Sequence, residues 1–391
     1  MFRSPLPQVA VMVETSRGYA RDILRGILRY EMEHGHWDIY TVPAGRKEQK
    51  LPSMTMPSKK GVIAHIVSAQ MVKEICKANL PTVSIFPTGD VPCVSKNLRN
   101  FAEVRLDSRS IGVMAAKHLL ECRFAHFGVI GEIYDADWSV HRVEAFVETI
   151  AMCGRIAAVY PTPNKNKMDW AVEQKYISKW LKSLPKPVGI FAATDIRAMN
   201  VIEACKHAGI NVPEEIAVVG VDNDELFCEM TSPKLSSVAI DAERAGYESA
   251  KALDHLMRGE KTLPTMCFGP LRVVVRRSSD VVGVDDLLVR KAVSFIRDCY
   301  TLPITVLNVV KALDVSRRQL EIRFKRALGH SIHEEIKKRR LGHVRTLLLE
   351  TDFSLDQIAE LSGFQCKNYL VNLFHKEFGM TMLTYRKSHH G

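Results

Sequence analysis

The sequence predicts a chain in two parts: two similar α/β lobes, each with a doubly wound parallel sheet, followed by an all-α part with two helix-turn-helix units. Three observations lead to this fold class. Short apolar runs alternate with helical patterns through residues 8–280, the alternation stops at a polar stretch over residues 276–286, and a short helical pattern then occurs twice. A chain of 391 residues is also too long for one compact core, so several domains are expected.

The strand-like runs of the first part are continuously apolar, which is typical of parallel strands covered by helices on both faces. They lie at residues 8–13, 61–66, 82–86, 126–131, 188–193, 216–221 and 271–276. The first helical pattern between them places Ile23, Ile27 and Tyr30 on one face and ends at Gly35. The pattern is too long for one sheet, so we expect two lobes, with a ligand in the cleft at the carboxyl ends of the strands.

The pattern changes near residue 281, where we place the domain boundary: residues 1–280 form the α/β part and residues 281–391 the helical part. Charge is distributed unevenly between them, within a net charge of +10 for the whole chain. From Val284 onward there are 18 Lys and Arg residues against 12 Asp and Glu, whereas the residues before it hold 36 against 32. A local basic excess of this kind indicates a nucleic-acid partner.

The helical part contains one short pattern twice. Three positions recur at a constant offset of 50, as Leu320, Phe324 and Gly329 and again as Leu370, Phe374 and Gly379. A shorter helical pattern precedes each copy, with Thr305 or Ser354 as a suitable N-cap residue and Asp314 or Gly363 at its end. Each copy is therefore predicted to be a helix-turn-helix unit.

The second helix of each unit is expected to begin at Ser316 or near Cys366. The residues predicted to hold the units together are Val309, Leu313, Leu320, Phe324, Ile358, Leu361, Leu370 and Phe374. Between the units, residues 331–350 predict a helix with an apolar stripe of Ile332, Ile336, Leu341, Val344 and Leu348. A helix of about 20 residues is about 30 Å long, close to the roughly 34–36 Å between successive major grooves on one face of DNA. One chain can therefore contact two adjacent grooves.

The second helix of each unit leaves polar side chains facing outward, as expected of a recognition helix. The candidates for DNA contact are Arg317, Arg318, Glu321, Lys325, Lys367, Asn368, Asn372 and Lys376. Arg and Asn can pair with guanine and adenine edges, and Lys mainly contacts phosphates. These could instead be ordinary solvated faces, but the duplication, the spacer length and the basic excess favour double-stranded DNA. The basic run at residues 337–340 is expected to be solvated or to face phosphates.

Side chains near the predicted strand ends are of the types that bind a neutral sugar, which needs carboxylate acceptors, an Arg donor and an aromatic ring. The candidates are Glu14, Tyr19, Trp138, Arg142, Asp195 and Asp222. Trp138 and Arg142 lie one helical turn apart, on one face. Each candidate has another interpretation: the two Asp residues could cap the helices that follow, Trp138 could belong to the core, and Arg142 could pair with a neighbouring acid.

Residues 286–388 resemble the DNA-binding domain of AraC/XylS-type transcription regulators, through the motif SLDQIAELSGF…LFHKEFGMT…YR. Residues 8–280 resemble the sugar-sensing domain of LacI/GalR regulators, which has the fold of periplasmic binding proteins. The stretches that carry this second resemblance are residues 104–120, 194–226 and 236–260. A sensor followed by an AraC-type unit is the order found in bacterial xylose-operon regulators, and the similarity to that family covers nearly the whole chain.

The resemblance implies a sugar-responsive transcription regulator of an operon for sugar use, with D-xylose favoured as the effector and activation as the outcome. It implies that Arg142, Asp195 and Asp222 surround the effector, that Trp138 is an aromatic of the same site, and that Asp107 binds a hydroxyl. It also implies a homodimer on operator DNA and, for an activator, contact with RNA polymerase. A regulator that senses a different sugar, or that represses, is the alternative.

Other classes of protein are disfavoured by the sequence. It has no G-x-x-x-x-G-K-[ST] loop, no G-x-G-x-x-G and no His and carboxylate cluster with metal spacing, so we expect no sugar kinase, isomerase or other enzyme, no cofactor and no metal. The nine cysteines are scattered, which fits reduced thiols in the cytoplasm. No apolar run of about 18 residues predicts a membrane span. A transport receptor with the same sensor fold would need an export signal, and the N-terminal residues do not resemble one.

Overall fold

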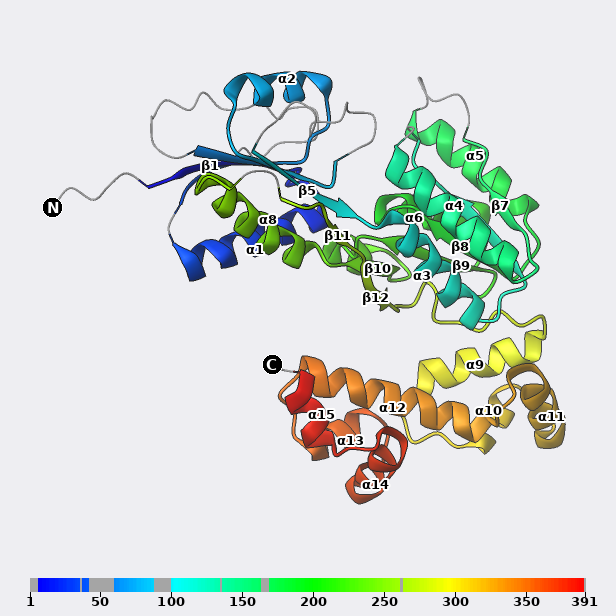
Figure 1. The fold of residues 1–391 in the computed structure, drawn as a ribbon. Coiled ribbons are helices and arrows are strands. Elements are labelled where there is room, and N and C mark those ends of the chain that lie inside the picture. Colours follow the sequence, from blue (N-terminus) through cyan, green and yellow to red (C-terminus); the bar gives the residue numbers. More distant parts are fainter. Residues whose placement is uncertain are drawn as a thin grey trace. The chain divides into compact units, whose positions relative to one another are not determined.

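The computed structural model describes residues 6–35, 37–41, 60–87, 100–133, 136–162, 169–260 and 263–389. The chain divides into two compact units, residues 1–280 and residues 281–391 (Figure 1). Each unit has its own hydrophobic clusters. In the described ranges, no helix combines the length and the apolar character that crossing a membrane requires.

The first unit contains two six-stranded sheets, one in each lobe. The sheet of the first lobe has the order β11 (Met266–Phe268), β5 (Phe101–Leu106), β4 (Thr82–Ile85), β3 (Lys60–Ala64), β1 (Gln8–Met12) and β2 (Asp38–Thr41), and its pairs are parallel. The sheet of the second lobe has the order β12 (Pro270–Val274), β10 (Ser236–Ile240), β9 (Ile216–Val221), β8 (Val188–Ala192), β6 (His126–Ile130) and β7 (Ala157–Val159). Here β12 runs antiparallel to β10 and the other pairs are parallel.

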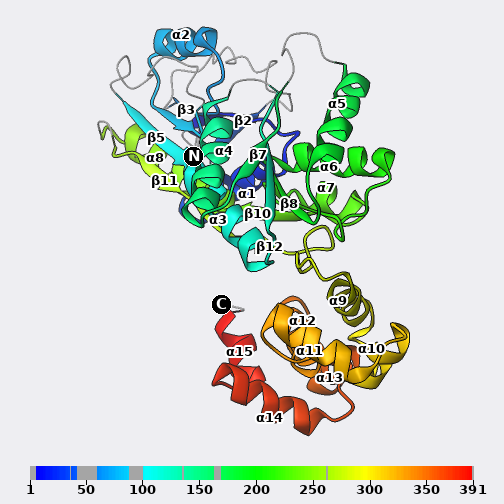
Figure 2. The same ribbon diagram turned by 90° about the vertical axis from the view of Figure 1, so that its right-hand side faces the viewer.

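Helices cover both faces of the sheets, as the apolar strands require. They are α1 (Gly18–His34), α2 (Ala69–Ala78), α3 (Ser108–Glu121), α4 (Asp137–Met152), α5 (Trp170–Ser183), α6 (Asp195–Ala208), α7 (Glu225–Met230) and α8 (Ala242–Met257). In the first lobe α2 lies on one face of the sheet, and α1 and α8 lie on the other (Figure 1). In the second lobe α3 packs on α4, and α5 packs on α6 (Figure 2).

All seven predicted strands form, as β1, β3, β4, β6, β8, β9 and β12. Helix α1 also forms as predicted: it ends at Gly35 and buries Ile23, Ile27 and Tyr30. Strands β2, β5, β7, β10 and β11 have no predicted counterpart, because they are short or interrupted by polar residues. Strands β7 and β11 have three residues each, and β10 begins with two serines. The antiparallel β12 also departs from the expectation of parallel sheets.

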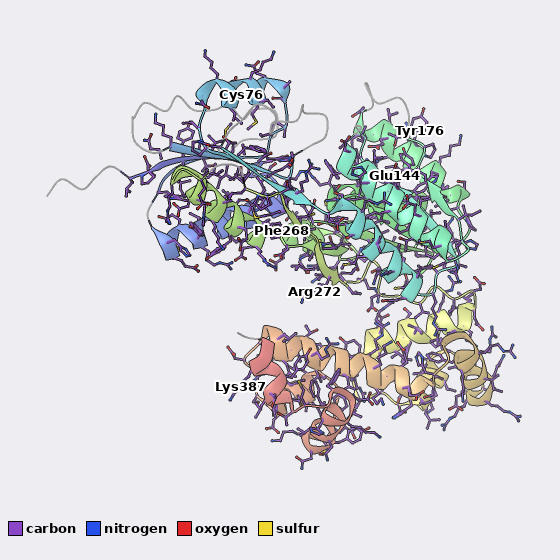
Figure 3. The ribbon with its side chains drawn as sticks, in the orientation of Figure 1. Cys76, Glu144, Tyr176, Phe268, Arg272 and Lys387 are labelled. Atoms are coloured by element: carbon purple, nitrogen blue, oxygen red, sulfur yellow. The ribbon has the colours of Figure 1, made fainter. Side chains whose placement is uncertain are left out.

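Three connections carry the chain between the lobes: β5 to α3, β10 to α8, and β11 to β12. Figure 3 labels Phe268, the last residue of β11, and Arg272 in β12, the two strands that the last connection joins. In a parallel sheet the strands end at one edge, so the loops that follow β1, β6, β8 and β9 are the segments that build the candidate sugar site.

The second unit is helical throughout its described residues. Its helices are α9 (Leu287–Cys299), α10 (Val306–Ala312), α11 (Arg317–Leu328), α12 (Ile332–Glu350), α13 (Leu355–Leu361), α14 (Lys367–Phe378) and α15 (Met382–His389). Helix α12 joins two small cores, with α9 to α11 around one end and α13 to α15 around the other (Figure 1). Its predicted stripe is confirmed: Ile332 and Ile336 lie in the first core, and Leu341, Val344 and Leu348 lie in the second. The predicted fold class is therefore confirmed for both parts of the chain.

Candidate effector site and DNA-binding helices

Arg142 lies at the centre of the candidate sugar site. It is buried on α4, and its Nη1 donates a hydrogen bond of 2.6 Å to the carbonyl oxygen of Ala193, just after β8. Its guanidinium carbon lies 4.7 Å from the ring centre of half-buried Trp138, and Nη1 lies 3.9 Å from a carboxylate oxygen of Asp222. Its Nε is buried and donates to no described residue. A buried guanidinium with an unused donor beside a carboxylate and an aromatic ring is suited to a hydroxyl-rich ligand.

Asp222 follows β9 in a left-handed backbone conformation, with φ of 102°. Burial raises the pKa of Asp222 from 3.8 to about 6, against the opposing charges of Arg142 and Arg17, while Glu132 raises it further. A carboxylate with so perturbed a pKa beside a buried arginine is a candidate functional group. The structure thus brings Arg142, Asp222 and Trp138 together, as the sequence predicted for neighbouring strand ends.

Asp195 is also buried, but its oxygens are used within the protein. Oδ1 accepts 2.5 Å from Ser237 Oγ, and Oδ2 accepts 2.8 Å from the backbone N–H of Asp224. Burial, and then the charge of Asp222, hold the pKa of Asp195 well above its usual range. Neither Asp195 nor Asp222 caps the helix that follows it, because the N-cap residue is Thr194 for α6 and Asp224 for α7. Asp195 therefore holds the turn after β9 in place.

The loop after β1, in the first lobe, lies near the turn after β9, since a Cβ atom at Gly18 would touch Asp224. Glu14 Oε1 accepts hydrogen bonds from Ser16 Oγ at 3.1 Å and from Arg17 Nε at 3.5 Å. Burial lowers the pKa of Arg17, but the charges of Glu14 and Asp222 outweigh burial and raise it above its ordinary value. Burial lowers the pKa of Arg142, while Asp222, Tyr19 and Glu132 act in the opposite direction. Of the two predicted residues of this loop, Tyr19 therefore acts on Arg142, whereas Glu14 acts on Arg17, which in turn acts on Asp222.

Two further residues belong to this neighbourhood but were not among the sequence candidates: Arg17 and Glu132. Glu132 follows β6 and accepts 2.8 Å from Thr194 Oγ1. An acid directly after an apolar run was the pattern that singled out Asp195 and Asp222, and the same pattern applies to Glu132. Arg17 lies within the loop that was quoted for Glu14 and Tyr19, but no local pattern distinguishes it.

One ion pair joins the two lobes beside the site. Arg21 on α1 donates through Nη2 to both carboxylate oxygens of Asp224, at 3.1 and 3.3 Å. The approach is close: a Cβ atom at Gly18 would lie 2.7 Å from Cγ of Asp224. A larger residue at position 18 would therefore separate α1 from the turn after β9.

Asp107 occupies a different place. It is the N-cap residue of α3, and its carboxylate accepts 2.9 Å from the backbone N–H and 2.5 Å from the hydroxyl of Ser110. No described hydrogen bond joins this carboxylate to Arg142 or Asp222. Its role as a sugar ligand stays a prediction.

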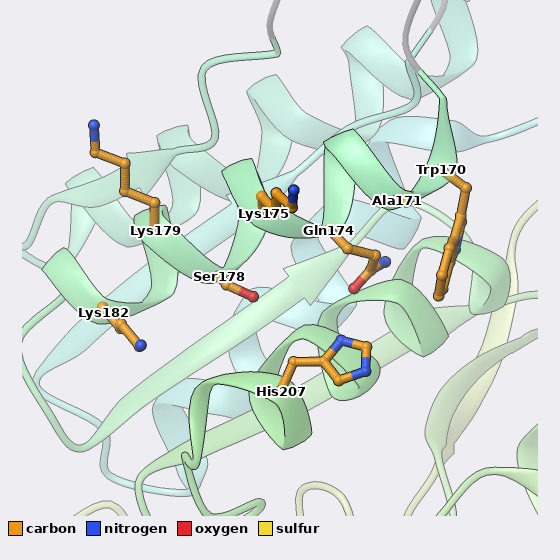
Figure 4. Close-up of a pocket in the computed structure, with 8 residues that line it drawn as sticks. All are labelled: Trp170, Ala171, Gln174, Lys175, Ser178, Lys179, Lys182 and His207. Carbon is orange, nitrogen blue, oxygen red and sulfur yellow. The ribbon is translucent and has the colours of Figure 1, made fainter.

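A groove between α5 and α6 is separate from these residues. Its lining residues are Trp170, Ala171, Gln174, Lys175, Ser178, Lys179, Lys182 and His207 (Figure 4). None of the predicted sugar-binding residues lines it. It is therefore not the site that the sequence predicts.

The first helices of the two helix-turn-helix units begin and end in the same way. Thr305 and Ser354 cap α10 and α13 as predicted, each within a capping box. After α13, Gly363 (φ 73°) donates to the carbonyl of Glu360, and the next N–H donates to that of Ala359. After α10, Asp314 (φ 51°) and the residue after it make the equivalent two bonds. Both turns are thus Schellman motifs.

The second helices begin at the predicted places, α11 after its N-cap Ser316 and α14 after its N-cap Cys366. Of the predicted recognition side chains, all but the half-buried Glu321 are exposed. Arg317 Nε bonds to Glu321 at 2.8 Å, and Lys367 Nζ bonds to Asp356 at 2.8 Å. Both are exposed pairs that a stronger phosphate contact can replace, because surface ion pairs are weak.

Two predictions for this unit need correction. Leu361 was expected in the second core, but its side chain is exposed; Phe364, Met382 and Tyr385 are buried in that core with Leu370 and Phe374. The basic run on α12 was expected to be solvated or to face phosphates. Instead, three of its four side chains bind the protein. Lys337 bonds to Glu377, and Arg339 bonds to Glu335. Arg340 donates to the carbonyl oxygens of residues 300, 302 and 304.

Comparison with known proteins agrees with this architecture. Residues 116–279 match the family model of a periplasmic binding protein-like domain, and residues 309–388 match that of a helix-turn-helix domain. The xylose operon regulatory protein of Haemophilus influenzae is 31% identical over 97% of this chain and 98% of its own length. That of Escherichia coli K12 is 29% identical over 97% of this chain and 96% of its own.

Solved structures give the same result. The structure of the xylose-binding transcription activator XylR superimposes with a TM-score of 0.68 at 28% identity, over 99% of both chains. A LacI family regulator from Enterococcus faecium with bound ribose covers 69% of this chain with a TM-score of 0.52 at 20% identity, which shows the sensor fold alone. The chain belongs to the family of xylose operon regulatory proteins, and is a DNA-binding transcription regulator with a sugar-sensing domain and not an enzyme.

Proposed function

We propose that the protein senses D-xylose and activates transcription of a sugar-utilisation operon. The observation that carries this proposal is the match to xylose operon regulatory proteins over nearly the full length of both chains. The solved relative of the same architecture is described as a xylose-binding activator. The group of Arg142, Trp138 and Asp222 supports it, because an arginine donor, a carboxylate acceptor and a ring together suit a neutral sugar.

In this proposal the sugar lies between the loops that follow β1, β6, β8 and β9. Arg142 donates to a hydroxyl, Asp222 accepts from one, and Trp138 stacks on the apolar face of the sugar. Arg17, Tyr19 and Glu132 complete the polar lining, because each acts on the pKa of Arg142 or Asp222, and Glu14 joins it through its hydrogen bond with Arg17. Asp195 keeps the turn after β9 in place through its bonds to Ser237 and Asp224.

Sugar binding shifts the equilibrium between open and closed lobes, because the ligand contacts both lobes only when they are closed. A ligand can move such an equilibrium only by its differential affinity for the two states. The Arg21–Asp224 pair joins the lobes in this structure, and it is a contact that the closed state retains.

On the DNA side, each chain inserts α11 and α14 into successive major grooves of the operator, as the approximately 30 Å length expected for the 19-residue α12 allows. The candidates for contact are the exposed residues of these helices, Arg317, Arg318, Lys325, Lys367, Asn368, Asn372 and Lys376, with Glu321 beside Arg317. We infer a homodimer, because paired half-sites suit a two-fold assembly. As an activator it would contact RNA polymerase, in the cytoplasm where the operator lies.

The effector is tested by thermal denaturation of the full-length protein with a panel of aldopentoses and hexoses. Because a ligand that binds only the folded state stabilises it by RT ln(1 + [L]/Kd), D-xylose should raise Tm by several degrees at millimolar concentration. Stabilisation by another sugar, with none by D-xylose, would identify a regulator of the same architecture for that sugar. Transcription from the operator-linked promoter in the presence and absence of the effector then separates an activator from a repressor.

A further inference from the structure

The turn after β9, residues 222–224, directs three consecutive side chains to three different places. Asp222 faces Arg142 in the candidate sugar site, 3.9 Å away. Asn223 Oδ1 accepts a hydrogen bond of 2.8 Å from Nη1 of Arg276. The carboxylate of Asp224 binds Arg21 of the other lobe. One short turn therefore contacts the sugar site, the lobe-to-lobe ion pair and a third partner that neither of these uses.

Backbone conformation and hydrogen bonds tie the residues of this turn together. Asp222 and Asn223 both have left-handed backbone conformations, with φ of 102° and 50°. The backbone N–H of Asn223 donates 3.0 Å to Ser237 Oγ, which itself donates to Asp195. A left-handed conformation at two successive residues with side chains persists only where surrounding contacts hold it. A shift of Asp222 towards or away from a ligand must therefore also shift Asn223.

The third partner, Arg276, belongs to the last segment of the first unit. We name residues 276–280 the connector, because the second unit begins at residue 281. The Arg276 side chain is 13% exposed. It bonds to three neighbours: Asn223, Glu229 on α7 at 2.9 Å, and the carbonyl of Leu235 at 3.1 Å. Its backbone N–H and C=O both bond to Ser236 Oγ at 2.8 Å.

The rest of the connector is fastened to the same sheet. Ser278 is fully buried; its hydroxyl donates 2.7 Å to the carbonyl of Val218 in β9 and accepts 2.8 Å from the N–H of Ser236. Ser279 Oγ lies 2.8 Å from His118 Nε2 on α3. The connector is thus bonded along its length to β9, β10 and α3, and Arg276 is its contact with the turn that carries Asp222.

We propose that Arg276 is a positioning residue that couples the sugar site to the connector and so to the DNA-binding unit. This rests on the proposed function, in which a sugar contacts Asp222 and closes the lobes. In this proposal the 222–224 turn has two positions, with and without a sugar at Asp222, and the position of Asn223 sets that of Arg276 and of the connector. The coupling is a free energy shared between sugar and DNA binding, and each ligand changes the affinity of the other by the same factor.

The test compares Arg276→Met with Arg277→Met in the full-length protein. Met keeps the volume of the aliphatic stem but donates no hydrogen bond, and Glu229 retains its ion pair with Lys234 at 2.6 Å. Arg277 is the matched control, an adjacent arginine whose ion pair is with Glu214 at 3.6 Å. The affinity for D-xylose is measured by calorimetry. The affinity for a duplex selected by the wild-type protein from a random pool is measured with and without D-xylose.

The ratio of the two DNA affinities reports the coupling, which in allosteric proteins is typically about 5–150-fold. We expect Arg276→Met to bind D-xylose within about threefold of the wild type and to lower this ratio towards 1, while Arg277→Met keeps it. Asn223→Gly removes the same contact from the other side, tolerates the left-handed conformation, and covers the case in which Arg276→Met does not fold. The double variant should lose no more coupling than either single variant.

Each other outcome has a distinct meaning. If the wild type shows no effect of D-xylose on DNA affinity, the proposed function fails in its effector or in its response. If the wild type responds and both Arg276→Met and Asn223→Gly respond equally, the inference about Arg276 is overturned. A loss of D-xylose binding itself in Asn223→Gly and Arg276→Met would also overturn it, because these residues would then belong to the sugar site.

Discussion

Asp195 and Asp222 show how far a single residue can be interpreted from its neighbours in the sequence. Both follow an apolar strand, and both were therefore candidates for sugar contact. The structure separates them: the oxygens of Asp195 accept from Ser237 and Asp224, whereas Asp222 faces Arg142 across 3.9 Å. The difference depends on which groups other strands bring to each carboxylate, and the sequence around each acid does not contain that information.

The raised pKa of Asp222, about 6, predicts pH-dependent sugar affinity. Burial favours the neutral acid, but a sugar hydroxyl that donates to Asp222 favours the carboxylate, so sugar binding must displace a proton below pH 6. We expect the affinity for D-xylose to rise as the pH increases from about 5 to 7 and to level off above. Calorimetry across this range measures it. Asp222→Asn should bind more weakly and lose this dependence; if the dependence persists, another group such as Asp195 causes it.

Asp222→Asn should weaken sugar binding, but it should stabilise the folded protein without sugar at pH 7. The folded protein without sugar binds the Asp222 proton more tightly than the unfolded chain does, so the contribution of Asp222 to stability is greatest below pH 4 and falls as the pH rises to about 6. At pH 7 this costs up to about 3 kcal/mol, which Asn avoids. Asp222→Asn should therefore have a higher Tm than the wild type at pH 7 and a similar Tm near pH 4. An unchanged Tm difference across this range would contradict the assignment.

At the scale of secondary-structure elements, the two helix-turn-helix units are alike but not identical. Their second helices are related by an offset of 50, α11 beginning at 317 and α14 at 367, whereas their first helices, beginning at 306 and 355, are related by 49. The second turn therefore has one more residue. At the offset of 49 that relates the first helices, Leu313 corresponds to the buried Ser362, and the exposed Ala312 corresponds to Leu361. This register shift is why the prediction of a buried Leu361 is wrong.

The turns differ in one further respect that can be tested. Gly363 has φ of 73°, and a Cβ atom there would lie 2.5 Å from the carbonyl oxygen of Tyr300. Gly363→Ala should therefore destabilise the helical unit by more than the roughly 1–2 kcal/mol that a left-handed conformation costs a residue with a Cβ atom. Hydrogen exchange of amides in α13 and α14 would measure the change. The matched variant, Asp314→Gly in the exposed first turn (φ 51°), should leave α10 and α11 equally or more protected; an equal loss in both variants would contradict this account.

For the whole molecule, DNA binding by two units in one chain implies that each recognition helix contributes separately to operator affinity. Arg318→Ala in α11 and Lys367→Ala in α14 should each weaken binding of the full-length protein to its selected duplex. A lost bidentate base contact would cost about 1–3 kcal/mol at one base pair, and a lost phosphate contact would reduce the salt slope by about 1. Fluorescence anisotropy at several salt concentrations distinguishes them.

The control for this measurement is Lys251→Ala, which removes a positive charge from α8 in the sensor unit. It should change neither the affinity nor the salt slope. If Arg318→Ala and Lys367→Ala behave like this control, the outward faces of α11 and α14 are not the DNA-binding surface.

The sequence by itself determined the order of the parts, the α/β and all-helical classes, the two helix-turn-helix units and the helix between them. These follow from local properties: apolar periodicity, capping residues and a repeat with a nearly constant offset. Tertiary structure alone decided which acid faces Arg142, that Arg17 joins the site, that basic side chains of α12 bind the protein itself, and that Arg276 reaches Asn223. Each of these is a contact between residues distant in the chain, and such contacts depend on how strands and helices pack, which no local pattern encodes.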